Sequence, residues 1–178
     1  MKLKNKKSGV LWLTGLSGAG KSTIGDRLSE ILQKKGTVTQ RLDGNLLKGC
    51  FGTKLNFKGD NHDLNIRLAA FVGSALEKHG VFVIASFISP YKHQRELVRD
   101  ASTNFIEVYV EASLDICTKR DVKGFYKKII SGERNNFPGF SYPYEIPENP
   151  NLVVNTENSD IELSVKKILD YLLKEKYI

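Results

Sequence analysis

With 178 residues, 40% of them hydrophobic and 26% charged, the chain suits a single folded domain spanning residues 1–178, and its composition excludes a disordered or fibrous protein. Its two cysteines, Cys50 and Cys117, are too few for a disulfide framework, so we expect free thiols in a reducing compartment. A net charge of +7 leaves two classes of partner open, a nucleic acid and a small anionic substrate.

The first segment of the chain, residues 1–8, is rich in lysine, and we expect it to be a frayed tail. The apolar run that follows, Val10 to Leu13, is too short for a signal sequence or a membrane span. We therefore expect a cytoplasmic protein that does not associate with a membrane.

Short β-rich runs then alternate with helical runs, which is typical of a parallel sheet with helices on both faces. Strands are predicted over residues 10–13, 38–42, 81–86, 105–110 and 152–154. Helices are predicted over about 21–35, 64–79, 113–120 and 160–174. The sequence thus predicts an α/β fold with a five-stranded, mainly parallel sheet.

A long segment between Asp121 and Pro150 is rich in lysine, glycine, asparagine, proline and aromatic residues, and it contains no clear strand. Loops of this length are usually functional. We interpret residues 121–150, approximately, as a lid over a binding site. An ordinary surface excursion is the alternative.

The segment Gly15 to Ser22 fits the pattern G-x-x-x-x-G-K-[ST] between a predicted strand and a predicted helix. In such a phosphate-binding loop (P-loop), backbone N–H groups converge on phosphate oxygens, and the helix N-terminus adds partial positive charge. Lys21 then reaches the β and γ phosphates, and Ser22 offers its hydroxyl group to Mg²⁺. We therefore predict a P-loop NTPase fold, a three-layer sandwich that binds ATP and Mg²⁺.

A P-loop alone does not separate kinases from GTPases and motor ATPases, so the acceptor side must decide. Asp43 follows the second predicted strand, and ligands of parallel α/β sheets bind beyond the carboxyl ends of the strands. There its carboxylate can orient an attacking hydroxyl group and take its proton. A plain turn residue in Asp43-Gly44 is the alternative.

Several motifs extend the pattern beyond the P-loop. They are Gly15 to Thr23, Leu42-Asp43-Gly44, Asn65-Ile66-Arg67, Phe87 to Tyr91, Phe105 to Val110, Arg120 to Lys128 and Pro143 to Pro147. Together they resemble the adenylyl-sulfate kinase family from about residue 8 to residue 174. The set is far more specific than the P-loop alone.

The resemblance implies phosphoryl transfer from ATP to the 3′-hydroxyl group of a small nucleotide, by a protein that is commonly a homodimer. It implies three catalytic residues: Lys21, Ser89 near the transferred phosphate, and Asp43 as the base or as the organiser of water and Mg²⁺. The implied ATP site comprises Gly15, Ser17, Gly18, Ala19, Gly20, Lys21, Ser22, Thr23 and Arg120, and the implied acceptor site comprises Lys48, Phe57, His62, Asn65, Ile88, Ser89, Lys123 and Phe137. Phe57 and Phe137 would sandwich the acceptor base, ordinary core packing being the alternative.

The departures from the family pattern concentrate on the acceptor side. Where the family reads Asp-Gly-Asp-Asn-x-Arg, the chain has Asp43-Gly44-Asn45-Leu46-Leu47-Lys48, and Asn61-His62 replaces Asp-Arg. In the lid, Phe-Thr-Gly-Ile-Asp becomes Phe137-Pro138-Gly139-Phe140-Ser141. Two family arginines that would hold the anionic end of adenylyl sulfate are thus Lys48 and His62, which lack the planar fork of arginine.

These changes suggest an acceptor with less negative charge at its distal end than a sulfate carries. The cytidine diphosphoramidate kinase of capsular phosphoramidate synthesis, which is similar to the family, fits this pattern, and we place cytidine diphosphoramidate ahead of adenylyl sulfate. A genuine adenylyl-sulfate kinase that makes 3′-phosphoadenylyl sulfate in sulfate activation is the alternative. A non-catalytic nucleic-acid-binding P-loop module, suggested by the net charge, is a distant third and no nucleic-acid partner is expected.

Overall fold

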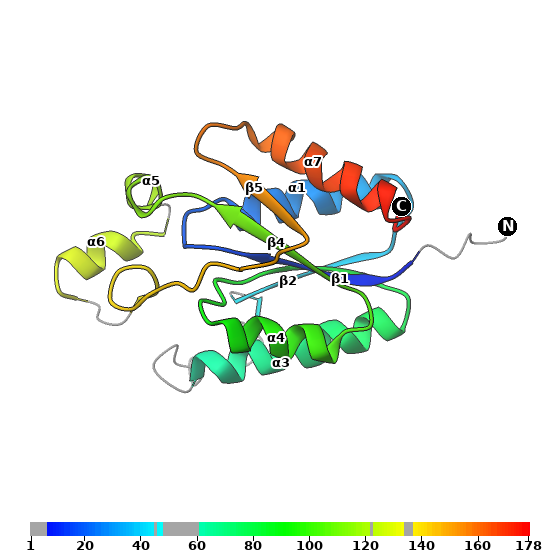
Figure 1. The fold of residues 1–178 in the computed structure, drawn as a ribbon, viewed down its shortest axis with the longest axis horizontal. Coiled ribbons are helices and arrows are strands. Elements are labelled where there is room, and N and C mark those ends of the chain that lie inside the picture. The colour runs from blue at the N-terminus through cyan, green and yellow to red at the C-terminus, as the bar shows by residue number, and fades with distance from the viewer. Residues whose placement is uncertain (1–6, 45, 48–60, 122, 134–136) are drawn as a thin grey trace, which may run out of the picture.

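Five strands form one sheet at the centre of the molecule (Figure 1). The structure is a computed structural model, and it describes residues 7–44, 46–47, 61–121, 123–133 and 137–178. The strands are β1 (Gly9–Thr14), β2 (Thr39–Asp43), β3 (Phe82–Ser86), β4 (Phe105–Glu111) and β5 (Leu152–Asn155), in the order β2-β3-β1-β4-β5. All four pairings are parallel, so the five carboxyl ends meet at one edge of the sheet.

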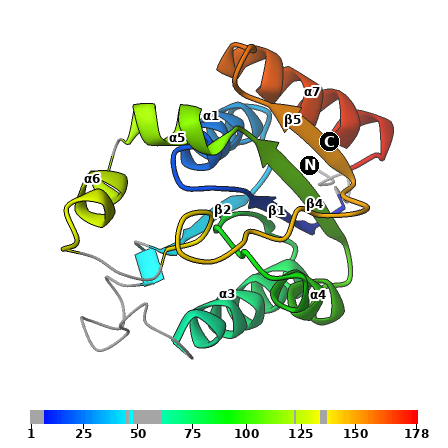
Figure 2. The same ribbon diagram turned by 60° about the vertical axis from the view of Figure 1, so that its left-hand side comes forward.

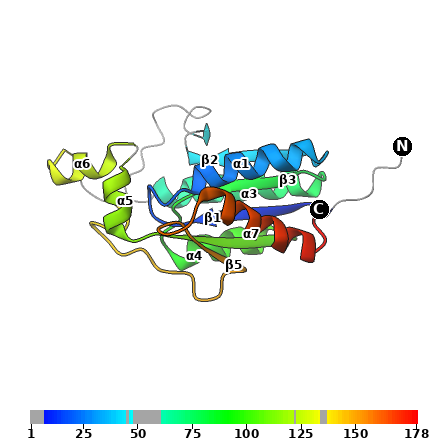
Figure 3. The same cartoon turned by 90° about the horizontal axis from the view of Figure 1, so that it is seen from above.

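Helices cover both faces of this sheet. They are α1 (Lys21–Lys34), α3 (Asn61–Lys78), α4 (Lys92–Ala101), α5 (Leu114–Arg120), α6 (Phe125–Ile130) and α7 (Ile161–Lys174). Figures 1 and 3 show α1 and α7 on one face and α3 and α4 on the other. Figure 2 shows α5 and α6 beside the carboxyl edge of the strands. The predicted three-layer α/β sandwich is confirmed, with a fully parallel sheet.

The alternation of side chains along β1 explains why the sheet needs a helical layer on each face. Leu11 and Leu13 pack into the core beneath α1 and α7, whereas Val10 and Trp12 pack into the core against α3. Successive residues of a strand point to opposite faces, and every residue of β1 is buried. A central strand of a parallel sheet has this pattern.

Two helices, α4 and α6, were not predicted from the sequence. In α4 the two large aliphatic residues, Leu97 and Val98, are adjacent, so the chain lacks the apolar spacing that indicates an amphipathic helix. The buried residues of this helix are Gln94, Arg95 and Val98, so that two of the three are polar. The short helix α6 lies within residues 121–150, and its six residues are too few to show a period.

Within the described ranges, no helix combines the length and the apolar character needed to cross a membrane. Cys117 is buried with a free thiol, and Cys50 lies outside the described residues.

Candidate active site

A cavity of about 550 Å³ opens at the carboxyl edge of the sheet, within the size range of small-molecule sites. Its walls come from the P-loop, the end of β2, the loop after β3, the α5–α6 region and the segment after β5. The predicted residues that line it are Ser17, Gly18, Gly20, Lys21, Ser22, Thr23, Asp43, Asn65, Ile88, Ser89, Arg120, Lys123 and Phe137. The structure thus brings the predicted donor and acceptor residues to one cavity.

Some predicted residues fall elsewhere. Gly15 and Ala19 belong to the same P-loop but not to the cavity lining. Lys48 and Phe57 lie outside the described residues, and for His62 the structure describes the backbone in α3 but not the side chain. The structure therefore does not test the positions on which the change of acceptor was argued.

The P-loop can only be built with glycine at two of its positions. Gly15 has a φ of +146°, and a Cβ atom there would lie 2.4 Å from the carbonyl oxygen of Val110. Gly18 has a φ of +82°, and its Cβ would lie 2.9 Å from the carbonyl oxygen of Cys117. Both distances are below any real Cβ contact, so the loop depends on glycine for its close approach to β4 and α5.

Residues remote in the sequence hold the carbonyl groups of this loop. The Thr156 hydroxyl donates to the Ala19 carbonyl at 2.8 Å, and the Tyr126 hydroxyl donates to the Ser17 carbonyl at 2.9 Å. Sequence analysis missed both donors. Thr156 directly follows β5, so the rule that sites form beyond strand ends would have found it. Tyr126 lies within the motif Arg120 to Lys128, but that motif does not indicate a contact with the P-loop.

Arg120 joins the same arrangement from the end of α5. Its guanidinium donates to the Gly18 carbonyl at 3.3 Å and to the Thr156 carbonyl at 2.6 Å. It therefore connects the P-loop to the segment after β5, on the wall of the cavity where the sequence placed ATP.

The Lys21 side chain is buried and lies against its own loop. Its Nζ donates to the carbonyl oxygens of Gly15 at 2.8 Å and Leu16 at 2.6 Å. Burial lowers the pKa of Lys21 from 10.5 to about 7, with a further lowering by Lys123 and an opposing effect of Cys117. A pKa of about 7 means that both protonation states of Lys21 are populated near neutral pH, and in either state Nζ can donate to the two carbonyl groups.

Asp43 is the last residue of β2 and pairs in register with Ser86 of β3. Its carboxylate lines the cavity and also accepts a hydrogen bond from the Leu46 backbone at 2.8 Å. The residues described after Asp43, namely Gly44, Leu46 and Leu47, are helical rather than a plain turn, and one Asp43 oxygen accepts from the start of this segment while the residue remains part of the cavity wall.

The loop after β3 carries Ser89, which has a φ of +39° although it is not glycine. A non-glycine residue in this region is strained by about 1–3 kcal/mol, and such strain is concentrated at functional sites. The Ser89 hydroxyl lies 3.0 Å from the Trp12 indole nitrogen and 2.8 Å from the Thr14 hydroxyl. The side chain is thus engaged by β1.

Donor and acceptor rules fix the direction of this hydrogen-bond chain. The Thr14 hydroxyl donates its single proton to the Ile88 carbonyl at 2.8 Å, because a carbonyl only accepts. The Ser89 hydroxyl and the Tyr144 hydroxyl, each 2.8 Å away, must then donate to Thr14. Burial raises the pKa of Tyr144, which keeps that phenol protonated as the chain requires.

Phe137 is buried and lines the cavity. Its ring packs at centroid distances of 5.6 Å from Phe125 and 5.4 Å from Tyr126. Core packing, the alternative given for this residue, is therefore present alongside a place in the cavity wall.

Comparison with known proteins identifies the family. The family model described as adenylylsulphate kinase matches residues 7–155. The chain belongs to the adenylylsulphate kinase family. It is accordingly an ATP-dependent kinase, a phosphotransferase that uses ATP and Mg²⁺ and whose acceptor is a hydroxyl group.

Individual relatives agree with the family assignment. The chain is 42% identical over 176 residues to an adenylyl-sulfate kinase of Halothermothrix orenii, which covers 99% of this chain and 95% of the relative. It is 48% identical over 160 residues to a probable adenylyl-sulfate kinase of Pseudomonas aeruginosa, covering 90% and 75% of the two chains. The solved APS kinase CysC of Mycobacterium tuberculosis, in complex with AMPPNP and APS, is 33% identical with a TM-score of 0.88, covering 94% of this chain and 98% of that one.

Proposed function

We propose that the chain transfers the γ-phosphoryl group of ATP to the 3′-hydroxyl group of adenylyl sulfate. The observation that carries this proposal is the single cavity in which the P-loop, Asp43 and the Ile88–Ser89 loop meet. Family membership and the similarity to a solved APS kinase that holds AMPPNP and APS support the choice of acceptor. This choice replaces cytidine diphosphoramidate as the first candidate.

The residues of the donor side suit a magnesium nucleotide. The Ser22 hydroxyl and the Asp43 carboxylate, both in the cavity wall, are hard oxygen donors of the kind that Mg²⁺ prefers, with water completing its coordination. Lys21 would bind the β and γ phosphates, and Arg120 and Thr23 would belong to the nucleotide site. When bound, Mg²⁺ supplies neutralisation of charge on the phosphates.

Asp43 is proposed to act on the acceptor hydroxyl group, as its base or by holding it for attack. In phosphoryl transfer most of the catalysis is positioning and electrostatic stabilisation, so orienting the acceptor hydroxyl group is the main contribution expected of this carboxylate. Asn65, Ile88, Lys123 and Phe137 would line the acceptor side of the cavity, together with Ser89.

Cytidine diphosphoramidate is the second candidate, and one sequence observation favours it. Lys48 and His62 stand where the family has arginines for the anionic end of adenylyl sulfate. Neither offers the planar, bidentate fork of arginine to that end. An acceptor whose distal phosphate is amidated would need that fork less.

The test compares both nucleotides under the same conditions. The protein is incubated with Mg-ATP and either adenylyl sulfate or cytidine diphosphoramidate, and ³¹P NMR follows ADP and the new 3′-phosphate. We expect a higher kcat/KM for adenylyl sulfate. A higher value for cytidine diphosphoramidate would reverse the order of the candidates, and no turnover of either would overturn both.

A double variant, Lys48→Arg with His62→Arg, tests the specificity argument separately. If these residues weaken the hold on a sulfate, restoring both arginines should raise kcat/KM for adenylyl sulfate by tenfold or more while leaving the KM for ATP within twofold. An unchanged preference would show that Lys48 and His62 do not govern the choice of acceptor.

Two broader expectations remain proposals. Residues 1–178 are proposed to form one kinase domain in which residues 121–150 close over the bound nucleotides, and limited proteolysis with and without ATP would detect that closure as protection. A homodimer is also proposed. A solved APS kinase from Thiobacillus denitrificans is hexameric, so analytical ultracentrifugation should distinguish a dimer from a larger assembly.

A further inference from the structure

Helix α4 buries a charged residue, Arg95, which is only 4% exposed. Its Nε lies 3.0 Å from a carboxylate oxygen of Glu107 on β4, and Glu107 is 5% exposed. Its Nη1 donates to the backbone carbonyl of Ser89 at 2.8 Å. The guanidinium therefore joins a buried carboxylate to the strained residue of the acceptor loop.

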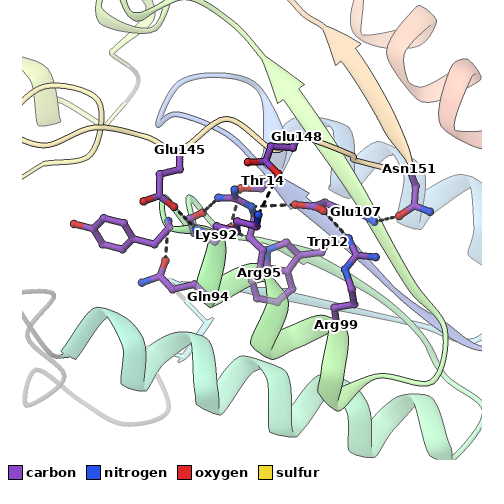
Figure 4. Close-up of polar contacts among 12 residues, drawn as sticks. Trp12, Thr14, Lys92, Gln94, Arg95, Arg99, Glu107, Glu145, Glu148 and Asn151 are labelled. Carbon is purple, nitrogen blue, oxygen red and sulfur yellow. Dashed lines mark hydrogen bonds and ion pairs between the residues drawn. The ribbon is translucent and has the colours of Figure 1, made fainter.

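A buried ion pair of this kind needs a reason other than stability. Removing both charges from water costs about as much as their attraction returns, and apolar residues of similar volume are often at least as stable. Arg99, the second partner of Glu107, contacts the other oxygen at 2.7 Å from a half-exposed position. Figure 4 shows Arg95 and Arg99 both turned toward Glu107.

The two arginines differ in what else they contact. Arg99 lies 4.7 Å from the centroid of the Phe105 ring, away from the acceptor loop. Of the two arginines, Arg95 is the one that donates a hydrogen bond to Ser89 within the described part of the chain. Among the described residues that line the cavity, Ser89 is present and Arg95 is not.

Ser89 is fixed from two sides. Trp12, which stacks on Phe87 at a centroid distance of 4.7 Å, donates to its hydroxyl oxygen, and that hydroxyl donates to Thr14. Its carbonyl group accepts from Arg95. Because the φ of Ser89 is +39°, we expect its backbone to relax toward negative φ if one of these hydrogen bonds is lost.

We propose that Arg95 is a positioning residue for the acceptor. Anchored by Glu107, its guanidinium holds the Ser89 carbonyl, keeps Ser89 in its left-handed backbone conformation, and so sets where the Ile88–Ser89 backbone faces the acceptor in the cavity. The inference rests on the proposed function only in that the acceptor binds at this loop.

The test uses a matched pair of variants, Arg95→Lys and Arg99→Lys. Both keep a positive charge near Glu107, but a lysine at position 95 cannot present a fork to the carboxylate and the carbonyl at once. For Arg95→Lys we expect the KM for the acceptor to rise about tenfold while the KM for ATP stays within twofold. For Arg99→Lys both KM values should stay within twofold of wild type.

A second readout does not depend on activity. Trp12 is the only tryptophan, so a ¹⁵N-labelled protein gives a single indole N–H resonance, and that group donates to Ser89. Displacement of Ser89 in Arg95→Lys should shift this resonance, whereas Arg99→Lys should leave it in place. If the wild type turned over no acceptor, the proposed function would fail, and this resonance would still decide whether Arg95 holds Ser89 in place.

The outcomes are distinct. A folded Arg95→Lys variant with unchanged acceptor KM and an unchanged indole resonance overturns the proposal, and so does an equal effect of Arg99→Lys. If Arg95→Lys does not fold, Glu107→Gln replaces it, since it weakens the anchor of both arginines while keeping its shape. It should shift the resonance and raise the acceptor KM, and wild-type values for both would be contrary to the proposal.

Discussion

The pH dependence of Lys21 gives the sharpest test of the donor site. Its pKa is lowered from 10.5 to about 7 in the folded protein, chiefly by burial. Between these two values the unfolded chain holds a proton that the folded chain has released. The free energy of unfolding therefore rises with pH in this window, and below about pH 7 the contribution no longer changes.

The magnitude follows from the two pKa values. Between pH 7 and pH 9 the free energy of unfolding gains about 2 kcal/mol from Lys21, since each pKa unit is worth about 1.4 kcal/mol and the folded group is half titrated at the start. Urea unfolding of wild type and Lys21→Met at both pH values isolates this gain, which the methionine variant should lack. Identical pH slopes for the two proteins would refute the lowered pKa.

The same shift links ATP binding to proton uptake. At pH 8 roughly nine in ten molecules hold a neutral Lys21 if its pKa is about 7, whereas phosphate oxygens beside Nζ favour the charged form. Binding of Mg-ATP should therefore take up about one proton, which calorimetry in buffers of different ionisation enthalpy measures. Binding enthalpies that do not depend on the buffer would contradict this expectation.

Three further predictions concern single substitutions. Asp43→Ala should lower kcat by about 10² or more with little change in ATP affinity, measured by turnover and calorimetry, and surviving turnover would reduce Asp43 to a turn residue. Gly15→Ala should destabilise the fold by about 1–3 kcal/mol and weaken ATP binding in urea and binding titrations, because the added Cβ would meet the Val110 carbonyl at 2.4 Å. Ser89→Ala should lower the free energy of unfolding by about 1–3 kcal/mol, because the Trp12 indole loses its hydrogen-bond acceptor. We expect kcat to fall less than tenfold. A loss of 10² in kcat would instead indicate that the Ser89 hydroxyl group takes part in the chemistry.

Much of the fold could be predicted because most of its strands are runs of buried, mainly apolar residues and because glycine residues indicate its turns. The strand at residues 81–86 is nearly all apolar, and the observed β3, Phe82–Ser86, agrees within one residue. Helix α4 was not predicted because most of its buried residues are polar. Its buried face carries Arg95, which contacts Glu107 and Ser89, and Gln94, which donates to Asp63. No local pattern predicts such partners.

The site shows the same division between local and remote signals. The P-loop is a contiguous motif whose glycines are required by close contacts, so its sequence predicts its place in the cavity. Tyr126 and Thr156, which hold its carbonyl groups, are separated from it by more than a hundred residues of chain. The position of Thr156 just after β5 places it at the site edge of the sheet, but which carbonyl group each hydroxyl contacts depends on the tertiary fold.

For Ser89 the sequence indicates the position in the site, but it does not indicate which groups its hydroxyl and carbonyl contact. Sequence resemblance places it at the transferred phosphate, but the direction of its hydroxyl group and the sign of its φ depend on Trp12, Thr14 and Arg95. Since those three contacts come from the core side of the loop, residues that face the acceptor can change without disturbing them. These three contacts hold Ser89 from the core, whereas the acceptor contacts proposed for Lys48 and His62 rest on their positions in the sequence.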